Sequence, residues 1–351
     1  MTYQGDYIDA HIYGTANNHK IKVSTTDDAT FLSCKLTVDF NGEEWIHTFE
    51  APFFQNTAEL YFENYIHSII TQKFKLDELT VDDYKFYSFD LAVVKMELKE
   101  MDANVILSEL ELNFSMVLGN FAALKESFLT DGVKRLLPVA QANFLTDNGV
   151  LSFSFLATTY PSKLIVNDVS KTLPTADTTT KKLHTLTIPV KKIISAASEL
   201  KLTLNFASNG SFELGSFSVL NEGVDHNLIA YQNEFGTLSV IELTGELQTD
   251  EQYKESIFRH SNAKKVTLTP TKIEIKKMYM LNTGHMRDVS KYRMLQSVLK
   301  SFNRFISDDG LQRIILSSAQ RIKPFKSDYY LNNETLKFKL SENDDIYYRA
   351  F

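Results

Sequence analysis

The residues whose types suit acid–base chemistry are concentrated in one stretch of the sequence. This stretch holds five carboxylates: Glu97, Glu100, Asp102, Glu109 and Glu111. Two carboxylates that converge on one cleft are what glycoside hydrolysis requires. However, Glu109 and Glu111 alternate with Leu110 and Leu112, which is typical of a strand with one polar face. We therefore interpret the carboxylates as a solvated face and predict no catalytic residue among them.

Motifs for metals, nucleotides and nucleophiles are absent from the sequence. The eight histidines are scattered, with neither His-x-x-x-His nor Cys-x-x-Cys spacing. No Gly-rich phosphate loop and no Gly-x-Ser-x-Gly turn occurs. His47 alternates with Trp45 and Phe49, so we interpret it as a sheet residue. We expect no metal, no cofactor and no enzymatic activity.

The single cysteine, Cys34, lies in a row of apolar residues that alternates with polar ones, from Leu32 to Phe40. Such a row predicts a strand with one buried face. We interpret Cys34 as a small core residue rather than a nucleophile. Because one cysteine cannot form an internal disulfide, the sequence favours folding in a reducing compartment.

The composition is that of a globular protein with a moderate negative charge. Of 351 residues, 43% are hydrophobic and 23% are charged, and the formal net charge is −7. Neutralising phosphates requires a basic face, so we expect no nucleic acid partner. No apolar run approaches the roughly 18 residues of a membrane helix, and the N-terminus lacks the pattern of a signal peptide. We therefore expect no membrane partner and folding in the cytoplasm.

The elements that would position any site are mostly strands. The alternating row from Leu32 to Phe40 is followed by Asn41-Gly42, and apolar residues resume at Trp45. Asn-Gly accepts the positive φ angles of a tight turn, so these residues predict a β-hairpin. The longest helical pattern begins at Val289, where apolar residues recur at spacings of three and four.

The sequence predicts a mainly β fold with two or more antiparallel β-sandwich-like modules and a C-terminal β module that carries one amphipathic helix. We divide the chain into an N-terminal β domain (1–120), a linker with a short helix (121–145), a middle β domain (146–230) and a C-terminal module (231–351). The amphipathic helix is predicted at 288–306. Asp288 is its expected N-cap.

Aromatic residues gather near the C-terminal end of the sequence. The interface candidates there are Tyr329, Tyr330, Tyr347, Tyr348 and Phe351. Tyrosine supplies contact area at low entropic cost, so such a cluster can anchor a protein partner. Alternate members could equally belong to the core of the module. Both interpretations stay open at this level.

A sequence resemblance begins at the motif Tyr231-Gln232-Asn233-Glu234-Phe235-Gly236. It continues through Val289 to Phe305, Ile314 to Ser318, Lys323-Pro324-Phe325, Leu336 to Leu340 and Tyr347 to Phe351. In this order the segments resemble structural tail proteins encoded by phages and prophages of Bacteroidetes. There, an aromatic-x-Asn-x-x-Gly turn opens a β module that ends in a helix and short strands. The likeness covers about one third of the chain, extends loosely to 45–70, and departs at Tyr231, where Trp is expected.

The resemblance implies a non-enzymatic virion protein of a phage tail, connector or baseplate. Its implied partners are other copies of itself and other virion proteins, and it would be made and folded in the host cytoplasm. The alternative is a carbohydrate- or receptor-binding adhesin module, which would display an exposed aromatic platform. A glycan-degrading enzyme would need two converging carboxylates in a deep cleft.

Overall fold

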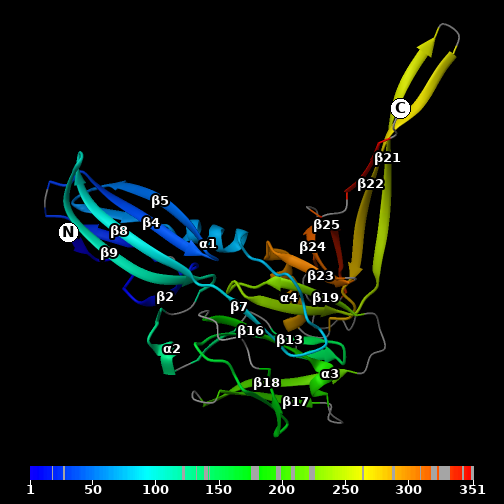
Figure 1. Ribbon diagram of the computed structural model, residues 1–351, viewed down its shortest axis with the longest axis horizontal. Coiled ribbons are helices and arrows are strands. Elements are labelled where there is room, and N and C mark those ends of the chain that lie inside the picture. Colours follow the sequence, from blue (N-terminus) through cyan, green and yellow to red (C-terminus); the bar gives the residue numbers. More distant parts are fainter. Residues whose placement is uncertain are drawn as a thin grey trace.

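A computed structural model describes the chain up to residue 348, with gaps. The gaps are residues 18, 27, 121–122, 132, 138–140, 142, 175–181, 195–198, 207–209, 221–225, 263–264, 287–288, 309, 318–321, 324–332 and 342–343. Only the backbone is described for residues 130–131, 254–255, 258–262, 265–276, 308 and 344–348. The described residues form a mainly β structure of several antiparallel sheets with a few helices, which confirms the predicted fold class (Figure 1).

The N-terminal part packs two sheets and one helix around a single core. Its strands are β1 Thr2–Tyr3, β2 His11–Gly14, β3 Ile21–Ser24, β4 Phe31–Phe40, β5 Glu43–Pro52, β6 Thr57–Leu60, β8 Ala92–Asp102, β9 Val105–Val117 and β10 Leu124–Lys125. The larger sheet has the order β10-β2-β9-β8-β4-β5, and the smaller has the order β1-β3-β6. Helix α1 (Glu63–Gln72) buries Ile66, Ile69 and Ile70 in this core.

The predicted hairpin is confirmed as β4 and β5. Asn41 and Gly42 form its turn with φ angles of 55° and 75°, the left-handed values that Asn-Gly accepts at low cost. Every second side chain of β4 from Leu32 to Val38 is fully buried. The period-two pattern therefore predicted correctly which face of this strand is buried.

The middle part is a second sandwich. Its strands are β7 Lys85–Phe89, β11 Lys134–Leu136, β12 Phe144–Thr146, β13 Val150–Leu156, β14 Lys163–Val166, β15 Val169–Thr172, β16 Leu183–Pro189, β17 Glu199–Phe206 and β18 Gly210–Leu220; its short helices are α2 Phe128–Asp131 and α3 Val190–Ile193. The sheet orders are β11-β13-β16-β7 and β12-β18-β17-β14-β15. Strand β7 comes from the segment 1–120 yet pairs with β16, so it ties that segment to the middle part.

The C-terminal part forms one sheet with the order β20-β19-β23-β24-β25-β22-β21, and β26 also pairs with β22. The bounds are β19 Asn227–Gln232, β20 Leu238–Leu243, β21 Leu247–Asn262, β22 Lys265–Asn282, β23 Arg304–Asp308, β24 Gly310–Leu316, β25 Thr335–Leu340 and β26 Asp344–Tyr348. The core of this part is continuous with that of the middle sandwich.

The amphipathic helix is shorter than predicted. Helix α4 spans Val289–Lys300, so the prediction of 288–306 is wrong at its C-terminal end. The guanidinium of Arg304 donates hydrogen bonds to the carbonyls of Val298 and Leu299 and so caps the helix. Ile306 fits the helical spacing but is buried from strand β23, while Phe302 is exposed. Asp288, the expected N-cap, lies outside the described residues.

Candidate functional site

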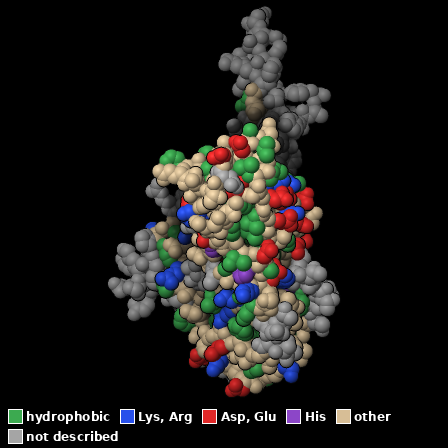
Figure 2. Space-filling model, turned by 90° about the vertical axis from the view of Figure 1, so that its left-hand side faces the viewer, with side chains coloured by type: hydrophobic (Ala, Val, Ile, Leu, Met, Phe, Trp, Pro, Cys, Tyr) green, Lys and Arg blue, Asp and Glu red, His purple; other side chains and the backbone are tan. Residues whose placement is uncertain are grey.

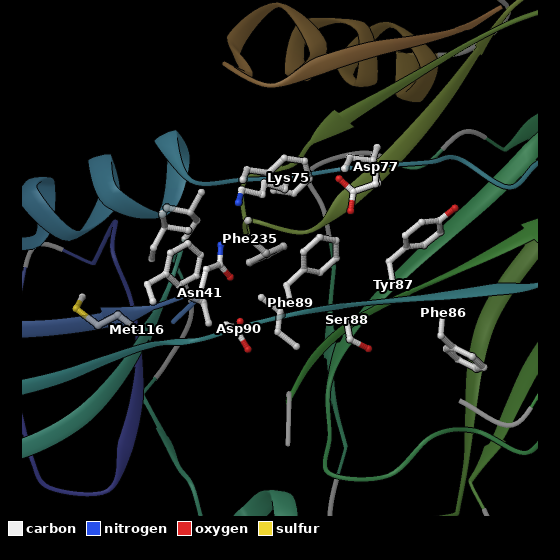
Figure 3. A pocket seen from close by; sticks show the side chains of 18 of the residues that line it. Asn41, Lys75, Asp77, Phe86, Tyr87, Ser88, Phe89, Asp90, Met116 and Phe235 are labelled. Atoms are coloured by element: carbon white, nitrogen blue, oxygen red, sulfur yellow. The ribbon is translucent and has the colours of Figure 1, made fainter. Parts of the chain in front are cut away.

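A cleft of about 530 Å³ lies where the N-terminal sandwich meets the rest of the molecule. Five segments make up most of its lining: the β4–β5 turn, residues 74–78 after α1, strand β7, residues 116–118, and the facing loop at 235–236. We call it the junction cleft. Figure 3 shows Asn41, Lys75, Phe89 and Phe235 arranged around one space from four different segments. Its volume is typical of a small-molecule site.

The lining of the junction cleft is aromatic on one side and polar at its rim. The rings of Phe74 and Phe89 are stacked with centroids 5.5 Å apart. The Tyr87 hydroxyl accepts a hydrogen bond from the Thr80 N–H at 2.8 Å, and burial raises the pKa of Tyr87. Among its described lining residues there is no histidine or cysteine. The lining thus combines aromatic surface with polar side chains, and the hydroxyl of its Ser88 lies 3.0 Å from His184 Nδ1.

A buried turn between β19 and β20 holds one wall of the junction cleft. The Asn233 side chain accepts hydrogen bonds from the N–H groups of Phe235 and Thr237, at 3.0 and 3.2 Å. In the facing segment just after β9, Gly119 has φ of 96°, and a Cβ there would lie 2.8 Å from the Glu234 carbonyl oxygen. The two backbones therefore approach closely only because one of them is glycine. The motif at 231–236 is the turn that the sequence predicted.

A buried asparagine links α1 to the C-terminal sheet beside the cleft. The Asn303 Nδ2 donates hydrogen bonds to the Thr71 carbonyl at 2.6 Å and to Gln232 Oε1 at 2.8 Å. Its Oδ1 accepts a hydrogen bond from Arg313 at 2.9 Å. Asn303 is only 2% exposed. An unpaired amide in this position would be costly, so this link fixes the N-terminal sandwich on the rest of the molecule.

The second feature is a long hairpin that projects from the body, formed by β21 and β22 (Figure 1). The strands have 16 and 18 residues. We call residues 247–282 the arm. β25 pairs with β22 at 279–282 and β26 at 272–276, so beyond Ser256 and Lys272 the described backbone of the two strands pairs only with itself. The outer edge of β21 has no partner strand in the described structure.

The predicted interface residues are partly located beside this arm. Tyr347 and Tyr348 lie on β26, opposite Ile273 and Lys272 of the arm. Tyr329, Tyr330 and Phe351 lie outside the described residues. The interface interpretation of all five stays a prediction. The arm itself was missed, although its strand pattern is visible in the sequence, because period-two alternation does not say whether a hairpin packs on a body.

The carboxylates of β8 and β9 are not all solvated. Glu100 is fully buried, so its interpretation as part of a solvated face is wrong. It accepts a hydrogen bond from the Ser108 hydroxyl at 2.5 Å and lies 3.1 Å from the α-amino group of Met1. It is in phase with the buried residues Met96 and Leu98 of β8, so its side chain lies on the buried face of that strand. Glu111 lies on the open face, 3.0 Å from the Lys95 ammonium.

A histidine and a carboxylate also meet near a hydroxyl in the middle of the molecule. His226 Nδ1 lies 2.8 Å from Glu242 Oε1 and 3.2 Å from the Thr146 hydroxyl. In a catalytic triad the hydroxyl and the carboxylate contact opposite ring nitrogens. Here both contact the same nitrogen, so His226 cannot relay a proton between them. We interpret this cluster as a polar link between β12 and β20.

The described part of the chain contains neither a cluster of metal ligands nor a membrane-spanning helix. No group of three or more His, Cys, Asp or Glu side chains is placed to hold a metal ion there. None of the helices described has the length and apolar character to cross a membrane.

No protein-family model and no curated protein matches the chain. One similar solved structure is SGBP-B of the mixed-linkage glucan utilization locus of Bacteroides ovatus, in complex with a mixed-linkage heptasaccharide. It is 9% identical, with a TM-score of 0.19 over 79% of this chain and 62% of that one. Another is a Ca²⁺-stabilized adhesin with which an Antarctic bacterium binds ice, 7% identical, with a TM-score of 0.14 over 95% of this chain and 99% of that one. The chain spans less than two thirds of the first protein. TM-scores this low do not indicate a shared fold with either protein.

Proposed function

We propose that this chain is a structural component of a multi-protein assembly and acts through protein–protein contact rather than catalysis. The observation that supports this is the arm, a ribbon of two strands that leaves the body of the molecule (Figure 1). Isolated two-stranded ribbons are only marginally stable in water. Tyr253 and Ile257 on the arm are 64% and 54% exposed. A partner that covers the arm would supply the missing packing.

The kind of assembly follows from the sequence resemblance, which points to a phage tail, connector or baseplate. Such assemblies repeat one chain many times and need extended contacts between copies or between different chains. Tyr347 and Tyr348, two of the predicted interface residues, lie on β26, which pairs with β22 of the arm, so a partner that covers the arm would lie close to them.

Shortening the arm tests this proposal. Residues 257–271 are replaced by Asn-Gly, which joins Ser256 to Lys272 through a two-residue turn. These two residues face each other in the ladder, and the pairing of β26 with Lys272–Lys276 is kept. The chain is co-expressed with the products of the genes that flank its own, and complexes are weighed by native mass spectrometry. Val169→Lys, at an exposed position on β15, serves as a surface control.

We expect the complete chain and the Val169→Lys control to enter a defined complex. The shortened chain should keep its melting temperature and remain outside the complex. A complete chain that stays monomeric with all of these proteins, or a shortened chain that assembles normally, would contradict the proposal.

The junction cleft favours a second candidate, a carbohydrate- or receptor-binding adhesin module. Stacked aromatic rings with polar groups at the rim are suited to a sugar, whose C–H faces pack on rings while its hydroxyls bond to the rim. However, Phe74, Tyr87 and Phe235 are all less than 10% exposed, so the described cleft is no open aromatic platform. Binding on a glycan array that Lys75→Ala and Asp77→Ala abolish would favour this function. Lys35→Ala, distant from the cleft lining, is the matched control.

A further inference from the structure

Strand β7 runs along the junction cleft with one edge unpaired. It is the last strand in the sheet order β11-β13-β16-β7, and within the described structure it pairs with β16 alone. The six consecutive residues Lys85–Asp90 all line the cleft. Figure 3 shows Tyr87 and Phe89 on one side of this strand and Phe86 and Ser88 on the other. The backbone edge of β7 therefore lies between two rows of side chains.

The hydrogen bonds at the two ends of the β13–β16 ladder show how the backbone groups of β16 are divided between its neighbours. The Ala157 N–H donates to the Lys182 carbonyl, and the Val190 N–H donates to the Gly149 carbonyl, both at 2.9 Å. Backbone groups of an antiparallel strand point alternately to one side and the other. The even-numbered residues of β16 therefore bond to β13, and its odd-numbered residues bond to β7.

This division identifies the unpaired backbone groups of β7. The odd-numbered residues of β16 lie opposite Lys85, Tyr87 and Phe89, which therefore bond to β16. The N–H and C=O groups of Phe86 and Ser88 point the other way, to the free edge. Neither residue has a backbone hydrogen bond to another segment of the described structure. Unpaired groups of this kind are what an added strand binds.

Enclosure distinguishes the β7 edge from an outer edge of the molecule. Strand β5, at one edge of the larger N-terminal sheet, consists mostly of exposed residues. Figure 2 faces the end of the molecule that carries this sheet and shows charged and hydrophobic side chains interspersed on its surface. By contrast, Lys85–Asp90 are all buried or half-buried and line a cleft. An edge recessed in this way cannot meet the edge of another folded sheet, so its occupant has to be a single extended segment.

The walls of the cleft suit the side chains of a segment paired with β7. Every second side chain of such a segment would lie on the side of Phe89, whose ring stacks on that of Phe74. Phe235 also lines the cleft, so apolar side chains fit at these positions. β7 has five residues, and an added strand of equal length spans roughly 17 Å.

We propose that the junction cleft binds an extended peptide segment of a partner protein, with apolar side chains at alternate positions, as a strand added to the free edge of β7. The backbone groups of Phe86 and Ser88 bind the main chain of the segment, and the aromatic wall selects its side chains. This inference goes beyond the proposed assembly function, because it uses a site other than the arm.

An array of synthetic peptides tests the class of ligand. Immobilised heptapeptides carry Val, Ile, Leu or Phe at every second position and Ser, Thr, Lys or Glu between them, and the purified complete chain is applied. We expect a subset of the peptides to bind. The strongest binder is then made in versions with one N-methyl group each, and fluorescence anisotropy measures their affinities. N-methylation at alternate positions, where the N–H faces β7, should weaken binding by at least about tenfold, and between them it should have little effect.

Ser88→Pro tests the site. Proline lacks the N–H that faces the free edge, and an edge strand tolerates it because the bonds of Tyr87 and Phe89 to β16 are kept. Ser88→Ala is the matched control, since it also loses the hydroxyl contacts with Tyr160 and His184 but keeps the N–H. We expect Ser88→Ala to bind the peptide as the wild type does, and Ser88→Pro to bind at least about tenfold more weakly.

Thermal unfolding checks that both variants are folded, and the N-methyl series, which uses the unaltered chain, decides the question if the proline variant is unstable. The proposal is overturned if no peptide binds, if N-methylation has no alternating effect, or if a folded Ser88→Pro variant binds normally. Binding of glycans without peptides would also overturn it and favour the adhesin function. The chain with the shortened arm should bind the peptides normally, so failure of this inference leaves the proposed assembly function standing.

Discussion

Two long hairpins of this protein contain strands with alternating apolar residues, β4 in one and parts of β22 in the other, and have opposite surroundings. The β4–β5 hairpin lies flat in the N-terminal sheet, and every second residue of β4 from Leu32 to Val38 is fully buried. The arm has longer strands, yet its described residues Tyr253 and Ile257 are exposed, and its far half pairs only with itself. Paired strands therefore form a buried hairpin in one place and an exposed one in another.

The difference shows what alternation measures. A period-two pattern selects the strand conformation and gives it one apolar face. It does not say which chain covers that face. In β4–β5 the cover comes from α1 and the small sheet of the same chain. For the arm we propose that it comes from a neighbouring molecule.

The largest effect is expected for a charge in the covered hairpin. Leu36→Asp places a carboxylate at a fully buried position of β4. An unpaired buried charge costs several kcal/mol, so we expect the free energy of unfolding to fall by about 3–5 kcal/mol. Urea denaturation measures this. Ile46→Asp on the neighbouring strand, 56% exposed, is the control and should change the stability by less than about 1 kcal/mol.

A smaller effect is expected at the link between the N-terminal sandwich and the C-terminal sheet. Asn303→Ala leaves the Thr71 carbonyl and Gln232 without their donor, so we expect a loss of about 2–3 kcal/mol. Asn303→Asp keeps the acceptor for Arg313 but loses both donated bonds. If Asn303→Ala unfolds at the wild-type urea concentration, this contact does not hold the two parts together.

The reactivity of Cys34 measures how tightly the covered hairpin is closed. Burial raises the pKa of its thiol from 9.0 to about 12, so the thiolate is scarce at pH 8 in the folded chain. We expect iodoacetamide to label the native protein very slowly and the denatured protein fully. Because the folded-state pKa is the higher one, the thiol stabilises the fold below pH 9, and this contribution is lost as the pH rises toward 12. Rapid labelling of the native chain at pH 8 would show that β4 opens.

The smallest effect on stability is expected in the arm. Tyr253→Ser and Ile257→Ser remove exposed side chains, so each should change the free energy of unfolding of the isolated chain by less than about 0.5 kcal/mol. The same variants should weaken assembly. Thermal unfolding of the monomer and native mass spectrometry of the complex measure the two effects. A large loss of monomer stability would mean that the chain itself covers these residues.

Part of the fold was predictable from local signals and part was not. The β4–β5 hairpin followed from alternation and one Asn-Gly turn, because both signals lie within a few residues of the structure they specify. The end of α4 was misplaced because Ile306 fits a helical spacing and a strand position equally well. The burial of Glu100 was missed for another reason: it is in phase with Met96 and Leu98 on the apolar face of β8, but its charge suggested a solvated position.

The candidate surfaces were less predictable than the fold. The aromatic pairs at the C-terminal end predict a contact region, which stays a prediction; Tyr347 and Tyr348 lie on β26, beside the arm. The junction cleft is assembled from five segments spread between residues 40 and 236, so no single motif could have indicated it. The open edge of β7 follows from the place of this strand at the end of the order β11-β13-β16-β7, which is a property of the assembled sheet.

The pairing of β7 with β16 has a consequence for how the chain is made. Ser88 and His184, hydrogen-bonded across this ladder, are 96 residues apart in sequence. During synthesis β7 leaves the ribosome long before its partner, and contacts that close such long loops form slowly. Until residues 183–189 emerge, β7 has an unpaired edge and is vulnerable to pairing with other nascent chains. A fragment of residues 1–120 would keep that edge permanently, and we expect it to aggregate during translation although it retains every strand of its own sandwich except β10.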